Sequence, residues 1–252
     1  MNFGSLFSGI GGIDLGLERA GMVCKWQVEI NPFCQKVLTK HWPDVERFGN
    51  VRGCGKHNLA TVVLIAGGFP CQPHSVAGKQ RGAADDRDLW PEMYRVIREL
   101  RPTWVLAENV LGIKGTILNS CLSDLESEGY WNYRDRWGRH RIAPLVIPAC
   151  AFNAPHKRER VFIVAYSKCN GLARGQLWET SCQSWNEAIA SEPFLLPVWP
   201  PGPGEIARIP RMAHGVPDRV DRVAALGNAV VPQVVEWIGR RIVEVESHPT
   251  QG

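Results

Sequence analysis

The sequence has 252 residues and a formal net charge of +4, with 44% hydrophobic and 21% charged residues. These values are typical of a globular protein large enough for one α/β domain and a small second lobe. No apolar run approaches the roughly 20 residues of a membrane helix. The N-terminal MNFGSLFSGIGG lacks the basic and apolar segments of a secretory signal. The sequence therefore predicts neither a membrane protein nor a secreted one. Its eight scattered cysteines, which form no CxxC pair, predict reduced thiols that are mostly core filler, and no metal site.

Short apolar runs alternate with helical periods along the first 166 residues. Strands are predicted at 3–7, 24–30, 61–66, 103–107 and 160–166, and helices at 13–20, 32–41 and 91–100. Asn31 is placed to cap the second helix, with Pro32 in its first turn. This alternation predicts an α/β fold with a doubly wound, mostly parallel sheet and helices on both faces.

The alternation stops after Tyr166. Residues 167–210 are rich in Pro, Gly, Ser and Trp and predict a small irregular lobe. Helical order returns near Pro232, where apolar residues at 234, 235, 238 and 242 share one face. That face predicts packing against the first domain, so the chain divides into residues 1–166, 167–210 and a returning segment, 211–252.

A glycine-rich turn, FSGIGG at 7–12, follows the first predicted strand and opens a helix. Glycines let the backbone approach a ligand, and a helix N-terminus attracts anionic groups. Alone, such a turn is equally consistent with a simple tight turn. Glu29 ends the second strand 17 residues after Gly12, close to the usual place of a ribose-hydroxyl acceptor. Together they predict an adenosine-containing cofactor.

Cys71 lies in GGFPCQPHS, directly after a buried strand, between two prolines that stiffen the loop. A thiol beside a helix N-terminus is a candidate nucleophile. Glu108 follows the next strand and either binds a ligand or caps a turn. Because ligands bind at the carboxyl ends of parallel strands, the loops starting near residues 8, 67 and 108 are predicted to share one cleft. That convergence favours a binding role for Glu108.

Two basic segments follow. Arg158 and Arg160 alternate before the last strand, so both guanidiniums share one face; the plainer interpretation is a basic surface strand. WNYRDRWGRHR at 131–141 mixes arginines with aromatic residues. It suits a phosphate backbone with nearby bases, and a solvated basic strand explains it equally well.

In this order, FSGIGG, GFPCQPHS, Glu108-Asn109-Val110, RERVFIVA and ALGNAVVPQVVEWIGRRI resemble the DNA cytosine-5 methyltransferase family, its bacterial and phage members most closely. The resemblance spans nearly the whole chain except 167–210. It implies a class I S-adenosylmethionine-dependent methyltransferase, Rossmann-like in fold, with 167–210 as a target-recognition lobe. It further implies methyl transfer from S-adenosyl-L-methionine to carbon 5 of a cytosine flipped out of double-stranded DNA.

The resemblance also implies site roles. Cys71 would add to carbon 6, Glu108 would hydrogen-bond the exocyclic amine and ring nitrogen 3, and Arg160 would bind the base carbonyl, with Arg158 supporting it. The implied cofactor residues are Phe7, Gly9, Gly11, Gly12, Glu29, Ile30, Asn50, Val51, Pro70 and Asn228. The implied DNA contacts, in an active-site loop at 75–87, are Ser75, Lys79 and Arg81.

The sequence departs from the family pattern at three positions. Ser5 and Asn50 stand where acidic residues are usual, and His156 stands where Gln is common. Two alternatives stay open: an RNA (tRNA) cytosine-5 methyltransferase, and an inactive adenosine-cofactor-binding module. The expected setting is the cytoplasm of a bacterial or phage-infected cell, as a monomer, with a cognate restriction endonuclease as a partner that the sequence cannot identify.

Overall fold

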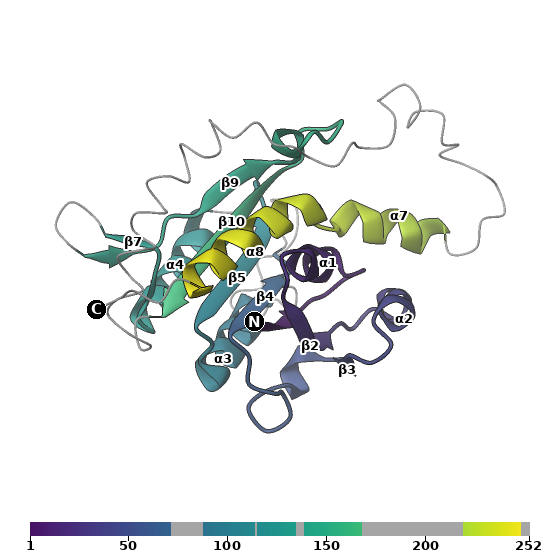
Figure 1. The fold of residues 1–252 in the computed structure, drawn as a ribbon, viewed down its shortest axis with the longest axis horizontal. Coiled ribbons are helices and arrows are strands. Elements are labelled where there is room, and N and C mark those ends of the chain that lie inside the picture. Colours follow the sequence, from purple (N-terminus) through teal and green to yellow (C-terminus); the bar gives the residue numbers. More distant parts are fainter. Residues whose placement is uncertain (72–87, 114, 135–138, 168–218, 248–252) are drawn as a thin grey trace, which may run out of the picture.

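The computed structural model describes residues 1–71, 88–113, 115–134, 139–167 and 219–247 (Figure 1). Its centre is a sheet in the order β3-β2-β1-β4-β5-β10-β6, with β9 also paired to β10. The strands are β1 (Asn2–Leu6), β2 (Val23–Val28), β3 (Glu46–Phe48), β4 (Leu64–Gly68), β5 (Trp104–Val110), β6 (Tyr130–Trp131), β9 (Leu145–Pro148) and β10 (Glu159–Ser167). The five neighbouring strands β3, β2, β1, β4 and β5 run parallel to one another, and β10 runs antiparallel to β5. The predicted doubly wound, mostly parallel sheet is confirmed, with an antiparallel edge.

The helices cover both faces of the sheet. They are α1 (Gly12–Arg19), α2 (Pro32–His41), α3 (Trp90–Leu100), α4 (Gly115–Ser127), α7 (Arg219–Asn228) and α8 (Pro232–Ser247), with short 3-10 helices η1 (Val51–Gly53) and η2 (Ala149–Phe152). A small hairpin joins β7 (Tyr133–Arg134) and β8 (His140–Arg141). None of the described helices is long and apolar enough to cross a bilayer.

Successive side chains along the strands pack alternately into two separate hydrophobic cores. On β4, Leu64 packs with α1 and α8, whereas its neighbour Ile65 packs with α3 and α4. Trp104 and Val105 divide in the same way on β5. The largely apolar composition of these strands follows from their burial on both faces.

Two strands extend beyond their predicted ends. The run predicted as a strand at 61–66 becomes β4 at Leu64–Gly68, because its ladder with β1 begins at the Phe3–Leu64 pair. Glu108 lies inside β5 instead of in the following loop, because β10 pairs with that strand as far as Val110. The motifs that carry Cys71 and Glu108 therefore begin within β4 and β5, whose ladders fix the backbone there.

The last helix returns to the first domain. In α8 the residues Val234, Val235, Ile238 and Ile242 are buried, as predicted. The helix packs against α1, where a Cβ at Gly16 would lie 2.6 Å from the carbonyl oxygen of Pro232. Figure 1 shows the two helices side by side. The lobe predicted at 167–210 lies outside the described residues except for Ser167, the end of β10.

Trp131, the first aromatic residue of the 131–141 segment, does not fit a base-stacking role. Trp131 is buried in the sheet, 6.2 Å in ring-centroid distance from Tyr166. Arg141 pairs with Glu126, with 3.0 Å between the charged atoms. The DNA-contact interpretation is therefore wrong for Trp131, while residues 135–138 lie outside the described part. Cys24, Cys34, Cys54 and Cys121 are buried free thiols, as expected for core filler.

Candidate active site

One pocket of about 500 Å³ opens at the carboxyl ends of β1, β4 and β5. Residues from the three predicted loops line it: Phe7 to Ile10 with Gly12, Gly68 to Cys71, and Glu108 to Val110. The predicted convergence of these loops is confirmed. A fourth wall comes from α7 and the turn between α7 and α8, and Asn228 is the residue of this wall that the sequence analysis named.

The glycine turn after β1 is built around Glu29. Gly9 has a φ of +56°, and its N–H donates to Glu29 Oε2 at 2.7 Å. The other carboxylate oxygen accepts from the Asn31 N–H at 2.7 Å. Gly11, with a φ of +84°, precedes α1 at a point where a Cβ would lie 2.4 Å from the Trp42 ring. These contacts hold a carboxylate and several backbone groups at one end of the pocket.

Beneath this turn lies a buried polar network centred on Asp14 of α1. Its carboxylate accepts hydrogen bonds from the Ser5 hydroxyl at 3.0 Å and from Gln27 Nε2 at 2.8 Å. Burial raises the pKa of Asp14 to about 6, against the opposing effect of these donors. The Gln27 oxygen in turn accepts from Arg47 Nε at 3.1 Å. A carboxylate therefore lies beside position 5, although it comes from α1.

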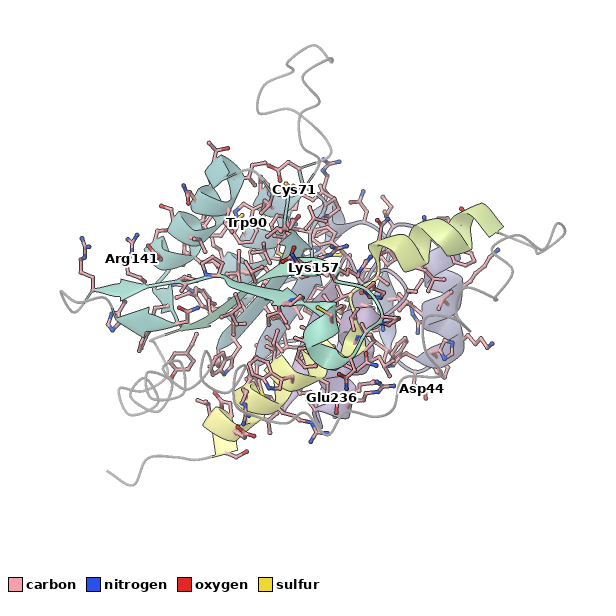
Figure 2. The ribbon with its side chains drawn as sticks, turned by 90° about the horizontal axis from the view of Figure 1, so that it is seen from above. Asp44, Cys71, Trp90, Arg141, Lys157 and Glu236 are labelled. Atoms are coloured by element: carbon pink, nitrogen blue, oxygen red, sulfur yellow. The ribbon has the colours of Figure 1, made fainter. Side chains whose placement is uncertain are left out.

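The start of the loop that carries Cys71 is held by hydrogen bonds to two successive backbone carbonyls. Asn109 Nδ2 donates to the carbonyl of Phe69 at 3.0 Å, and the Leu89 N–H donates to the carbonyl of Pro70 at 3.3 Å. The Phe69 ring packs on Trp90 at a centroid distance of 5.2 Å. Figure 2 shows Cys71 beside Trp90, on the opposite side of the molecule from Asp44 and Glu236. Cys71 is half-buried and lines the pocket.

Glu108 and Arg160 form an ion pair in the wall of the pocket. Arg160 Nε lies 3.0 Å from Glu108 Oε1. Glu108 is opposite Phe162 in the antiparallel ladder, so Arg160, two residues before Phe162, lies on the same face. Glu108 is 7% exposed, and this burial raises its pKa to about 7 although both Arg160 and Arg158 act to lower it. The pair is therefore a buried carboxyl that titrates near neutrality, beside a fixed cation.

Gly68 makes room for that carboxyl. It pairs with Glu108 across the β4–β5 ladder, and a Cβ at Gly68 would lie 2.8 Å from Glu108 Oε2. That spacing is shorter than real Cβ contacts allow. The second glycine of GGFPC therefore lets the Glu108 side chain extend over the end of β4.

Arg158 faces elsewhere. Its Nη2 donates to the carbonyls of Gly227 at 2.7 Å and Ala229 at 2.6 Å, on either side of Asn228. Arg158 does not line the pocket, whereas Arg160 does. The two alternating arginines thus have different partners.

The predicted cofactor residues divide into two groups. Six line the pocket: Phe7, Gly9, Gly12, Glu29, Pro70 and Asn228. Four do not line it in this structure: Gly11, Ile30, Asn50 and Val51. Asn50 instead caps η1, where its side-chain oxygen accepts from the Arg52 N–H at 3.0 Å. Ile30 is 69% exposed and Val51 is buried. Ser75, Lys79 and Arg81 lie outside the described residues.

Sequence reasoning missed the lining residues Cys34, Asp221 and Ala225. The spacing of Asp221, Ala225 and Asn228 is that of one helix face, so extending the final motif backwards as a helix would have found the two α7 residues. It also missed Asn109, whose side chain holds the Cys71 loop. No local signal distinguishes that role, because the bond spans 40 residues.

Known proteins match a large part of the chain. The family described as C-5 cytosine-specific DNA methylase matches residues 1–190. Type II methyltransferase M.Eco47II of Escherichia coli is 37% identical over 199 residues, covering 75% of this chain and 44% of that protein. Type II methyltransferase M.DsaV of Dactylococcopsis salina is 32% identical over 175 residues, covering 68% and 47%. The chain thus spans about half the length of these relatives.

Among solved structures, the chain is similar to a putative DNA modification methyltransferase encoded within a prophage of E. coli. The TM-score is 0.55 at 29% sequence identity, and the match covers 67% of this chain and 47% of the other. This similarity agrees with the class I methyltransferase architecture of the sheet described above.

Proposed function

The chain belongs to the C-5 cytosine-specific DNA methylase family, and on that premise we propose that it methylates carbon 5 of cytosine in double-stranded DNA. The observation that carries the proposal is the convergence of Cys71, Glu108 and Arg160 in one pocket. The glycine turn and Glu29 line the other end of the same pocket. A base and a methyl donor can therefore be held together in one space.

The base end of the pocket suits nucleophilic catalysis. Carbon 5 of cytosine is too weak a nucleophile to take a methyl group unaided. When the Cys71 thiolate bonds to carbon 6, the electron pair of the 5,6 double bond becomes available at carbon 5. Loss of the carbon 5 proton after methylation then restores the double bond and expels the thiolate. Asn109 contributes by holding the loop that aims the sulfur.

Glu108 and Arg160 prepare the base for this attack. A protonated Glu108 donates to ring nitrogen 3, while its second oxygen accepts from the exocyclic amine. The raised pKa, about 7, keeps much of this carboxyl protonated at neutral pH. In this proposal Arg160 binds the base carbonyl, and its ion pair with Glu108 at 3.0 Å supports a fixed orientation of that carboxyl. The base must leave the DNA stack to reach these groups, at a cost of a few kcal/mol.

The other end of the pocket fits S-adenosyl-L-methionine, which when bound supplies an electrophilic methyl group. Phe7, Gly9, Glu29, Pro70 and Asn228 would hold it. The donor carries a positive sulfonium, and two carboxylates, Glu29 and Asp221, line this end. Within the described lining, Arg160 is the only Lys or Arg, and it is paired with Glu108. The charge of the pocket therefore complements that of the donor.

Target recognition is assigned to residues 167–210, and phosphate contacts to Ser75, Lys79 and Arg81. Sequence reading requires side chains at base edges, whereas phosphate contacts fix the register. The presence of Cys71, Glu108 and Arg160 together in the pocket argues against an inactive cofactor-binding module, because cofactor binding alone requires none of these three side chains. RNA remains the competing substrate, and a cognate restriction endonuclease remains a candidate partner of a monomeric, cytoplasmic enzyme.

The test is transfer of a labelled methyl group from S-adenosylmethionine to unmodified genomic DNA, with bulk tRNA assayed in parallel. Cys71→Ser is expected to lower the rate by on the order of 10³-fold or more without loss of cofactor binding. Cys150→Ser is the matched control, because Cys150 is an exposed free thiol away from the pocket lining. A duplex containing 5-fluorocytosine should trap the unsubstituted protein covalently, since fluorine blocks the final elimination. Near-normal methylation by Cys71→Ser would refute the covalent mechanism, and transfer to tRNA alone would reassign the substrate.

A further inference from the structure

The turn between α7 and α8 is held between two parts of the catalytic domain. On one side it lies against the glycine turn, since a Cβ at Gly12 would be 2.6 Å from the carbonyl oxygen of Val230. On the other side the carbonyls of Gly227 and Ala229 accept from Arg158 at 2.7 and 2.6 Å. Asn228, which lies between these two carbonyls, lines the pocket.

Arg158 is well suited to fix this turn. The last carbonyls of a helix lack partners within the helix and carry about half a negative charge, so a cation there is stabilising. The backbone of Arg158 is itself held, because the carbonyls of Lys157 and Arg158 both accept from the Ala149 N–H, at 2.7 and 3.3 Å. Arg158 also has a φ of +32°, a conformation that non-glycine residues adopt at some energetic cost.

The same strand start carries Arg160 two residues later, paired with Glu108. One short segment therefore provides a base-binding side chain and a support for the cofactor wall. Burial lowers the pKa of Arg158, with the Arg160 charge adding to the effect. Bonds to two carbonyls offset the cost of burying that charge.

We infer that Arg158 is a positioning residue for the cofactor: it clamps the backbone on both sides of Asn228 and so closes the donor end of the pocket. This assignment rests on the proposed function. It differs from a role in binding the base, because the guanidinium bonds the turn and lies outside the pocket lining. The clamp acts on Asn228 through the main chain, so its loss should be felt in donor affinity and not in the chemical step.

The experiment is calorimetric titration with S-adenosylhomocysteine, together with kinetics at varied S-adenosylmethionine and saturating genomic DNA. Arg158→Ala is expected to weaken binding by roughly tenfold to a hundredfold and to raise KM for the donor by a similar factor. The kcat at saturating donor should stay within about threefold of wild type. Arg158→Lys, which keeps a charged donor, should restore part of the affinity and guards against a folding defect in the alanine variant.

Two control variants are measured in the same way. Lys157→Ala removes the neighbouring cation, which is 73% exposed and pairs with Glu159, and should leave donor affinity unchanged. Arg160→Ala should abolish transfer while binding S-adenosylhomocysteine normally. If Arg158→Ala binds S-adenosylhomocysteine like wild type and loses kcat, the clamp is wrong and the residue acts on the base. If wild type itself does not bind S-adenosylhomocysteine, the proposed function fails instead.

Discussion

Glu108 is expected to control the pH dependence of methyl transfer. Its carboxyl is 7% exposed, and burial raises its pKa from 4.5 to about 7 despite the nearby Arg160. Only the protonated carboxyl can donate to ring nitrogen 3 of the base. The active form is therefore fully present well below pH 7 and is lost as the pH rises through that value.

The magnitude follows from the raised pKa. With a value of about 7, the protonated fraction falls roughly tenfold between pH 6 and pH 8. Glu108→Gln keeps a donor and an acceptor but has no proton to transfer, so it should lose on the order of 10²–10⁴ in rate at pH 7. The ratio of wild-type to variant kcat/KM should fall about tenfold from pH 6 to pH 8. Titrations that are common to both proteins cancel in this ratio.

The assay is initial-rate transfer of labelled methyl groups to subsaturating genomic DNA in buffers of constant ionic strength from pH 6 to pH 9. Far-ultraviolet circular dichroism at each pH verifies that both proteins stay folded. A ratio that stays constant across this range would show that Glu108 acts in one ionisation state throughout, and the argument from its burial would then be refuted.

Two further substitutions test the packing around the site. Gly68→Ala should force Glu108 Oε2 to move by about 0.6 Å, from 2.8 Å to an ordinary contact of 3.4 Å, and should lower kcat about tenfold or more with little change in melting temperature. Gly53→Ala is the control, because a Cβ at Gly53 would have nothing within 4 Å. Equal rates in the two variants would contradict the prediction. Asp14→Asn removes a buried carboxyl whose pKa is raised from 3.8 to about 6. A raised pKa gives the wild-type protein stability that is lost as the pH rises through that window. Between pH 4 and pH 7 the free energy of urea unfolding should therefore shift by roughly 2.4 kcal/mol in favour of the Asn variant, and parallel pH profiles of the two proteins would contradict this prediction.

The sheet and the cleft could be predicted because they depend on local patterns. Apolar runs such as 61–66 mark strands buried on both faces, and parallel strands bring their carboxyl ends to one edge. That is sufficient to bring Cys71 and Glu108 into one pocket. The Asn31 cap and the buried face of α8 were likewise readable from spacing alone, and both are confirmed.

Partners far apart in the chain could not be predicted. The Arg158 side chain resembles that of Arg160 in the sequence, yet it bonds carbonyls 69 and 71 residues away. Strand ends depend on pairing with distant segments, which is why Glu108 lies inside β5. Asn50 stands where a cofactor contact was expected, but an Asn followed by a short helix can cap that helix instead. Such choices between partners are made through space and leave no periodic signal.

The close contact between α1 and α8 has a consequence for biosynthesis. Leu17 and Ile13 of α1 share a core with Val235 and Ile238 of α8. The apolar surface of α1 therefore emerges from the ribosome long before α8, the helix that covers it. At the 5–20 residues per second typical of translation, the delay is roughly ten to fifty seconds. During that interval the nascent chain exposes an apolar helix and several unpaired strands. We expect nascent chains arrested before Pro232 to bind chaperones or aggregate, and the emergence of the complete α8 to allow the apolar surface of α1 to be covered.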